Sequence, residues 1–196
     1  EEIAELLKSK LATYDSSWVS ELKKHEGYLF PDTYLMPKDA DIAMIIDILT
    51  DNFEIKLEAL QGNIGKTGLS LEESTVLASI VEREARFAKD RPIIAGILLN
   101  RLNLGMALQA DATVQYVLGY QQGEKTWWKK KLTKADLAVD SPYNTYKYPG
   151  LPPKPIANPG LAALTAAINP IETGYLYYLS DKEGHMHYAK SLEEHN

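Results

Sequence analysis

The sequence predicts an α+β fold: a helical centre, short strands at its edges, a C-terminal β-hairpin, and a long loop rich in proline and tyrosine. Two observations support this prediction. Apolar residues recur at helical spacing through most of the chain. Near the C-terminus, two short β-prone runs flank a turn that contains glycine. Helices in the middle with strands at the edges are typical of the α+β class.

The composition limits the classes of function. The chain has 196 residues, 45% of them hydrophobic, which is enough for a substantial core in one domain or a compact pair. The net charge of -6, without a basic stripe, argues against a nucleic-acid partner. The absence of cysteine excludes disulfides, thiolate nucleophiles and cysteine-ligated zinc. No run approaches the roughly 18 apolar residues that span a bilayer, so we expect this chain to be soluble.

The N-terminal part predicts two helices with a short strand between them. Apolar residues spaced for one helix face open the chain, as though it were excised from a longer protein. Residues 27–34 form an aromatic run interrupted by Pro31, which predicts a brief edge strand. Residues 39–60 carry apolar side chains at helical spacing, with Asp51 and Asn52 as a candidate break.

Two helices are predicted at the centre of the fold. Ser70 and Glu73 match a capping box, so a helix should begin at about Leu71 and continue through Arg86. The next helix should begin at Asp90, Arg91 and Pro92, and it should end at Gly105.

The C-terminal third predicts a loop, a helix and a hairpin. Residues 141–160 hold six of the ten prolines and three tyrosines. So long a loop is functional or disordered, and the tyrosines favour an ordered wall of a binding cleft. Residues 161–168 form an alanine-rich helix, and residues 175–179 and 185–189 flank a turn that predicts a β-hairpin.

The central helix carries two candidate acids, Glu82 and Glu84. Two positions on a helix point about 200° apart, so one cleft cannot receive both side chains. Glu84 lies beside the apolar face, whereas small residues surround Glu82 and leave room for a bulky ligand: Ala78, Ser79 and Ala85. The plain alternative is a solvated surface glutamate, and helix spacing alone favours that alternative.

Other polar candidates alternate within residues 108–114. In a strand, Gln109, Asp111 and Thr113 would share one face, as a substrate-lining edge requires; the plain alternative is a strand or turn with a solvated side. His185 and His187 also share a predicted strand face, but without a carboxylate there they favour a solvated hairpin over a metal site. The sequence predicts no cofactor.

Familiar motifs of other enzymes are missing. No glycine-flanked serine elbow and no phosphate-binding glycine loop is present. The remaining signal is a carboxylic acid with many aromatic residues, including Trp127 and Trp128. Aromatic faces with a polar edge suit sugar rings, although tyrosines buried in a core would look the same in a sequence.

Longer blocks resemble a known family. They follow the family's order from Glu26 to the last residue: 26–34 (EGYLFPDTY), 78–84 (ASIVERE), 108–114 (LQADATV), 141–146 (SPYNTY), 150–160 (GLPPKPIANPG) and 194–196 (EHN). Together they resemble the YceG-like family of endolytic murein transglycosylases. The departures are mild: Ala107 and Ala112 stand where the family often has proline, and Lys154 where it often has glycine.

The resemblance implies a bacterial cell-wall enzyme and assigns roles to residues. In the family, the glutamate of the second block is catalytic, and it falls on Glu82. The same block matching implies a set of residues that line the glycan cleft: Gln109, Asp111, Tyr143, Asn144, Thr145, Tyr146 and Asn158. Residues 1–25 would end a LysM-like or linker region, and residues 26–196 would form the catalytic domain.

The resemblance also implies a location and partners. The full protein would be anchored by one transmembrane helix, absent here, on the extracytoplasmic face of the cytoplasmic membrane. Peptidoglycan glycan strands would be its substrate, and cell-wall synthases its partners.

The expected reaction needs one carboxyl group. Glu82 would protonate the bond between N-acetylmuramic acid and N-acetylglucosamine, then accept a proton from the muramoyl 6-hydroxyl, leaving a 1,6-anhydro end. Two alternatives stay open. One is a peptidoglycan-binding scaffold that does not cut, and the other is a hydrolase in which Asp111 is the second carboxylate.

Overall fold

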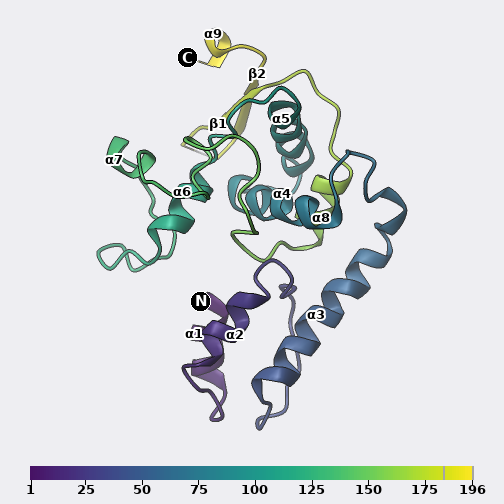
Figure 1. Cartoon of the computed structure of the whole chain (residues 1–196), viewed down its shortest axis with the longest axis vertical. Helices are drawn as coiled ribbons and strands as arrows, with labels where there is room; N and C mark the ends of the chain where they lie inside the picture. The colour runs from purple at the N-terminus through teal and green to yellow at the C-terminus, as the bar shows by residue number, and fades with distance from the viewer. Residues whose placement is uncertain (183, 196) are drawn as a thin grey trace.

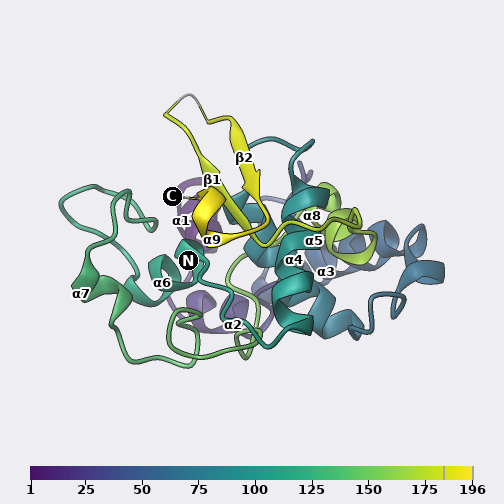
Figure 2. The same cartoon turned by 90° about the horizontal axis from the view of Figure 1, so that it is seen from above.

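A computed structural model describes residues 1–182 and 184–195. Its elements in chain order are α1 (Glu2–Lys10), α2 (Trp18–Lys24), α3 (Ile42–Glu58), the 3-10 turn η1 (Gln61–Asn63), α4 (Leu71–Glu84), α5 (Arg91–Asn103), α6 (Asp111–Leu118), α7 (Lys134–Leu137), α8 (Leu161–Ile168), β1 (Tyr177–Ser180), β2 (Met186–Ala189) and α9 (Leu192–His195). Figure 1 shows α4, α5 and α8 in the middle, with α1 and α2 below them. In Figure 2, α6 and α7 lie on one side and α3 extends to the other.

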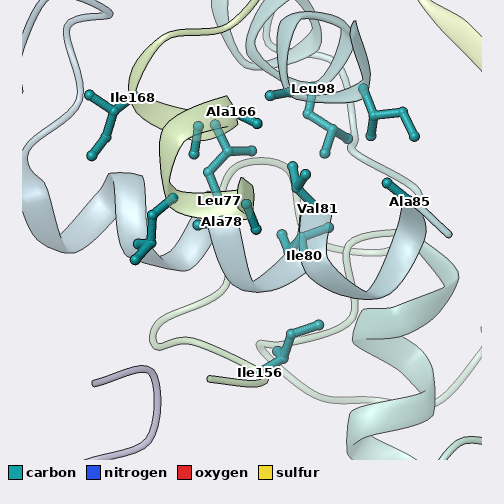
Figure 3. Packing of buried hydrophobic residues seen from close by; sticks show 14 of the residues in the cluster. Leu77, Ala78, Ile80, Val81, Ala85, Leu98, Ile156, Ala166 and Ile168 are labelled. Atoms are coloured by element: carbon teal, nitrogen blue, oxygen red, sulfur yellow. The ribbon is translucent and has the colours of Figure 1, made fainter. Parts of the chain in front are cut away.

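Helix α4 is the centre of the main core because most of its circumference is apolar or small. Every residue from Ser74 to Val81 is buried, and the helix packs against both α8 and α5. Figure 3 shows Leu98 of α5 on one side of α4 and Ile156 of the 141–160 loop on the other. The loop of residues 141–160 therefore packs directly on the central helix.

A second hydrophobic cluster gathers the N-terminal part. It contains residues from α1, α2, the following segment and the first half of α3: Ala4, Leu7, Trp18, Leu22, Leu29, Ala40, Ile45 and Leu49. The second half of α3 contributes Phe53 and Leu57 to the main core instead. Helix α3 therefore joins the two clusters.

The predicted centre and C-terminus are confirmed. Ser70 and Glu73 form the capping box, and α4 begins at Leu71. Helix α5 begins at Arg91, with Pro92 in its first turn, and α8 spans residues 161–168 as expected. Strands β1 and β2 pair antiparallel as a hairpin, in a register that places Tyr177 opposite Ala189. Residues 141–160 form a loop between α7 and α8.

The edge strand predicted at residues 27–34 is wrong. The structure describes this whole segment, and it forms turns and extended loop without strand pairing. Gly27 has φ +96°, and the side-chain oxygen of Asn158 accepts hydrogen bonds from the backbone N–H groups of Gly27 (2.7 Å) and Leu29 (3.2 Å). One side-chain amide thus satisfies donors that a neighbouring strand would otherwise have bound.

The strand considered for residues 108–114 does not form. Helix α6 begins at Asp111, and Gln109 before it has a positive φ of 51°. The alternation of polar residues comes from a helix start, because Thr113 turns inward and its hydroxyl donates to the carbonyl of Ala110. Thr145 completes this start by accepting a hydrogen bond from the Ala110 N–H at 3.0 Å.

The candidate break in the helix of residues 39–60 does not occur. Helix α3 is continuous through Asp51 and Asn52. The Asn52 amide donates to the Tyr34 hydroxyl at 2.9 Å, so it does not compete for the helix backbone. In the part of the chain that the structure describes, no helix has the length and hydrophobicity to cross a membrane.

Candidate active site

A cleft of about 1410 Å³ lies where the two hydrophobic clusters meet. Its floor and one wall come from α1, α2 and the segment after α2. The opposite wall comes from the C-terminal end of α4, from α6, from Trp127 and Trp128, and from the loop of residues 141–158. The volume exceeds the roughly 300–1,000 Å³ of a typical small-molecule pocket, so the cleft has room for a chain of several rings.

Glu82 reaches this cleft from the last turn of α4. Its side chain is 25% exposed, and both carboxylate oxygens are held. Arg91 Nη2 lies 2.6 Å from Oε1, and the N–H of Gly160 donates to Oε2 at 3.0 Å. Arg91 opens α5 and Gly160 precedes α8, so the two helices packed on α4 also orient its acid. Such an acid is fixed in direction and still open to a ligand.

Glu84 lies on the other side of α4 and does not line the cleft. Its carboxylate accepts hydrogen bonds from the N–H of Ala112 (3.0 Å) and the hydroxyl of Tyr178 (3.1 Å). Burial raises the pKa of Glu84, and the nearby charge of Asp111 raises it further. Of the two candidate acids on α4, Glu82 is therefore the one that lines the cleft.

Several of the predicted site residues gather around Glu84. The Tyr146 hydroxyl donates to Asp111 Oδ1 at 2.5 Å, and Gln109 Oε1 lies 3.5 Å from Arg101 Nη1. Burial, followed by the hydrogen bond to Asp111, raises the pKa of Tyr146. Gln109, Asp111 and Tyr146 do not line the cleft that contains Glu82.

The remaining predicted residues divide between the cleft and the interior. Tyr143 and Asn158 line the cleft with Glu82. Asn144 is fully buried, and its amide donates to the carbonyls of Leu137 (3.0 Å) and Val139 (2.8 Å). Thr145 is buried against the start of α6, where its hydroxyl lies 2.9 Å from that of Thr113. Asn144 and Thr145 therefore shape the loop from within.

Sequence reasoning missed three residues that line the cleft, Glu26, Arg83 and Tyr116, and one residue that holds Glu82, Arg91. Glu26 accepts a hydrogen bond from the Tyr116 hydroxyl at 2.5 Å, and the Tyr116 ring lies 5.0 Å from that of Tyr143. Arg83 stacks on Trp128 with its guanidinium 3.6 Å from the ring centroid, and Arg91 pairs with Glu82. The available signals were weak: Arg91 marked only a helix start, and Glu26 opened the block of residues 26–34 without a role being assigned to it.

The histidines of the hairpin lie away from the cleft. His185 and His187 contact the carboxylate of Asp181, at 3.3 Å and 3.2 Å. Both histidine side chains are mostly exposed, and Asp181 supplies a nearby carboxylate that was not identified from the sequence. Within residues 1–182 and 184–195, no group of three or more acidic or histidine side chains is arranged to hold a metal ion.

Comparison with known proteins gives consistent matches. The model of the YceG-like family matches residues 1–196. An endolytic murein transglycosylase of Bacillus subtilis (strain 168) is 39% identical over 172 residues, which cover 87% of this chain and 46% of that protein. An endolytic murein transglycosylase of Streptococcus pneumoniae serotype 2 (strain D39 / NCTC 7466) is 36% identical over 172 residues, which cover 87% of this chain and 31% of that protein.

A solved structure is also similar. The crystal structure of a yceG-like protein from Listeria monocytogenes superposes with a TM-score of 0.79 at 35% identity, covering 98% of this chain and 66% of that one. This chain spans less than half the length of the two curated relatives.

Proposed function

The chain belongs to the YceG-like family, and from this premise we propose that it is the catalytic region of a peptidoglycan lytic transglycosylase. The observation that carries the proposal is Glu82, an acid held at both oxygens and directed into a cleft with room for several sugar rings. Two relatives named endolytic murein transglycosylase support it. Under this proposal residues 26–196 are the catalytic domain.

The proposed reaction uses Glu82 first as an acid and then as a base. Its carboxyl proton passes to the oxygen of the β-1,4 bond between N-acetylmuramic acid and N-acetylglucosamine, and the bond from that oxygen to the muramoyl C1 breaks. The carboxylate then accepts the proton of the muramoyl 6-hydroxyl while its oxygen bonds to C1. The proton count on Glu82 is restored, and no water is consumed.

The surroundings of Glu82 suit this double role. A single side chain must face first the glycosidic oxygen and then the 6-hydroxyl, so its orientation has to be maintained between the two steps. Arg91 and the Gly160 N–H hold the carboxylate from two sides. Tyr143, Tyr116 and Trp128 supply aromatic surface along the cleft, as suits sugar rings.

The position of Asp111 argues against a hydrolase in which Asp111 is the second carboxylate. Asp111 is bonded to Tyr146 on the Glu84 side of α4, outside the cleft that contains Glu82. A hydrolase needs its second carboxylate beside the same scissile bond. We therefore propose that Gln109, Asp111 and Tyr146 support the cleft from behind, while Tyr143 and Asn158 line it.

The test is the chemistry of the new strand ends. We expect Glu82→Gln to abolish cutting of uncrosslinked glycan strands and to change the free energy of unfolding by less than about 1 kcal/mol, since the amide is nearly isosteric. The matched control is Glu72→Gln, an exposed glutamate on the same helix, which should cut normally. Mass spectrometry should find 1,6-anhydro ends in the wild-type digest.

Two results would contradict the proposal. Incorporation of heavy oxygen from labelled water into reducing ends would identify a hydrolase. Strands of unchanged length after incubation with the wild-type chain would identify a binding scaffold.

We also propose that the complete protein acts at the outer face of the cytoplasmic membrane, anchored by a transmembrane helix outside this chain, and meets cell-wall synthases there. Peptidoglycan is assembled at that face, so a strand-cutting enzyme would find its substrate as it is made. Cross-linking of the full-length protein in growing cells, followed by identification of the captured proteins, tests this proposal.

A further inference from the structure

Glu82 is not the only carboxyl group of the cleft wall. Glu26 follows α2 and lines the same cleft, on the wall formed by the N-terminal part. Tyr116 and Tyr143 line the cleft beside it. The proposed mechanism assigns no role to Glu26.

One oxygen of Glu26 is used by the protein and the other is free for a ligand. The Tyr116 hydroxyl donates to Oε2 at 2.5 Å. Among the residues that the structure describes, none donates a hydrogen bond to Oε1, and this atom is not among the fully buried unpartnered atoms. Oε1 is therefore an acceptor within reach of whatever enters the cleft.

The position of Glu26 is fixed by its neighbour Gly27. The Gly27 N–H donates to Asn158, and a Cβ at Gly27 would lie 2.3 Å from Pro155 Cγ, so the backbone is pressed against the loop. The same loop holds Glu82 through the Gly160 N–H. One stretch of chain, residues 155–160, thus sets the position of both carboxyl groups.

The Glu26 carboxyl group is partly buried and lies beside aromatic rings. Burial raises the pKa of Glu26, opposed by the hydrogen bond from Tyr116. The Tyr116 and Tyr143 rings lie 5.0 Å apart at 41° and offer apolar faces beside the acceptor. A hydrogen-bond acceptor partly shielded from water gains more from a ligand donor than a solvated one, and it rejects ligands that lack the donor.

We propose that Glu26, with Tyr116 and Tyr143, forms a second glycan subsite, in which Oε1 accepts a hydrogen bond from an N–H or O–H donor of a sugar residue next to the scissile bond. The subsite rests on the proposed function, because it presumes that a glycan strand occupies the cleft. Glu26 binds substrate in this subsite and takes no part in proton transfer.

Binding to the Glu82→Gln protein tests the subsite without any cutting. The probe is peptide-free, uncrosslinked glycan strand, titrated calorimetrically. Glu26→Gln is then added to the Glu82→Gln protein. The amide oxygen of the new side chain can still accept the hydrogen bond from the Tyr116 hydroxyl, but its NH₂ group now faces the donor group of the sugar, and two donors cannot form a hydrogen bond with each other. We expect affinity to fall about tenfold, the effect of one hydrogen bond to a charged group. The matched control, exposed Glu54→Gln on α3, should leave affinity unchanged.

Tyr116→Phe separates binding from support. It removes the hydrogen bond to Glu26 and retains both the Glu26 carboxyl and the aromatic ring, so affinity should fall less than in Glu26→Gln. Equal weakening by Tyr116→Phe and Glu26→Gln would overturn the subsite, because the bond between the two side chains would then be what matters. Unchanged affinity in Glu26→Gln would overturn it as well.

Kinetics of the otherwise wild-type enzyme give an independent readout. Glu26→Gln should raise KM while kcat stays within about threefold. A loss of kcat as complete as that of Glu82→Gln, at unchanged KM, would overturn the subsite and make Glu26 a second catalytic carboxyl. A different result would contradict the proposed function itself: a wild-type chain that neither binds nor cuts glycan strands.

The nature of the sugar donor follows from a second probe. A cello-oligosaccharide has ring hydroxyls and no acetamido group, whereas a chito-oligosaccharide has both. If the acetamido N–H is the donor, Glu26→Gln weakens binding of the chito-oligosaccharide alone; if a hydroxyl is the donor, it weakens both. Either pattern supports the subsite. If Glu26→Gln changes the binding of neither oligosaccharide, the subsite is contradicted.

Discussion

At the scale of single residues, the direction of Glu82 depends on partners that are distant in sequence. Arg91 lies nine positions away and Gly160 seventy-eight, and each binds a different oxygen of the carboxylate. The Arg91 Nε is buried and has no hydrogen-bond partner among the described residues, so this guanidinium is directed to Glu82 alone. We interpret Arg91 as a positioning residue that acts through Glu82.

Removal of Arg91 should lower turnover more than binding. Misplacement of a catalytic group by about 1 Å can cost about a hundredfold in rate, so Arg91→Ala should reduce kcat by about 10–100-fold, with KM within about threefold. Arg91→Lys should restore part of kcat, because it keeps a positive charge beside the carboxylate and loses only the fork geometry. Steady-state kinetics on glycan strands measure both.

The control is Lys89→Ala, an exposed cation in the same connection between α4 and α5, which should have normal kinetics. Thermal unfolding of each variant separates loss of positioning from loss of fold. A low kcat in Arg91→Ala that Arg91→Lys does not improve at all, with a matching loss of stability, would reduce Arg91 to a structural role.

The same scale explains which site residues sequence could and could not identify. The family block places Glu82 at a position with small neighbours, and the structure directs it into the cleft. Asn144 and Thr145 belong to the same kind of block, yet both are buried within the loop. A sequence block records that a residue matters and not whether it faces substrate or backbone. Glu26 also stands in such a block, but its hydrogen bond to Tyr116, which lies ninety positions away, cannot be inferred from the sequence.

At the scale of elements, the outcome of each prediction depended on whether local chemistry or tertiary contact decided the structure. The capping box at Ser70 and the hairpin are local signals, and both are confirmed. Residues 27–34 were wrongly predicted as a strand because the partner of that backbone is the side chain of Asn158. Residues 108–114 do not form the strand that their alternation allowed, because alternation over so few residues fits a helix start as well as a strand.

The contact between residues 27–29 and the 155–158 loop can be tested at Gly27. Gly27→Ala combines a positive φ, which costs an L-residue about 1–2 kcal/mol, with a Cβ 2.3 Å from Pro155. Gly65→Ala is a matched control, because Gly65 has a similar φ of +86° and open space around its Cβ position. We expect Gly27→Ala to lose more unfolding free energy than Gly65→Ala and to lose cutting activity, which Gly65→Ala keeps.

Chemical denaturation and glycan-strand assays measure the two effects of Gly27→Ala. Equal stability and equal activity in the two alanine variants would mean that the contact between residues 27–29 and the 155–158 loop contributes to neither. Activity lost in Gly27→Ala without any loss of stability would still locate the effect at the cleft, because the segment carries Glu26.

At the scale of the whole molecule, the cleft lies between two hydrophobic clusters that share α3. The N-terminal cluster combines α1 and α2 with Leu29 and the first half of α3, and the main core combines the second half of α3 with α4, α5 and α8. The predicted boundary between residues 25 and 26 therefore runs through one cluster. We expect the N-terminal part to open locally more readily than the main core, since it is built on fewer buried residues.

Local opening can be tested by a pair of equivalent core substitutions. Leu22 in α2 and Leu77 in α4 are both buried leucines, one in each cluster. Each Leu→Ala change should cost about 2–5 kcal/mol where its cluster is formed.

Hydrogen exchange followed by mass spectrometry should show Leu22→Ala accelerating exchange in α1, α2 and the first half of α3 while α4 and α8 stay protected. Leu77→Ala should accelerate exchange throughout the main core, because α4 packs against α5, α6 and α8. Uniform acceleration in both variants would show that α3 couples the clusters into one cooperative unit. In that case the walls of the cleft could not move independently of each other.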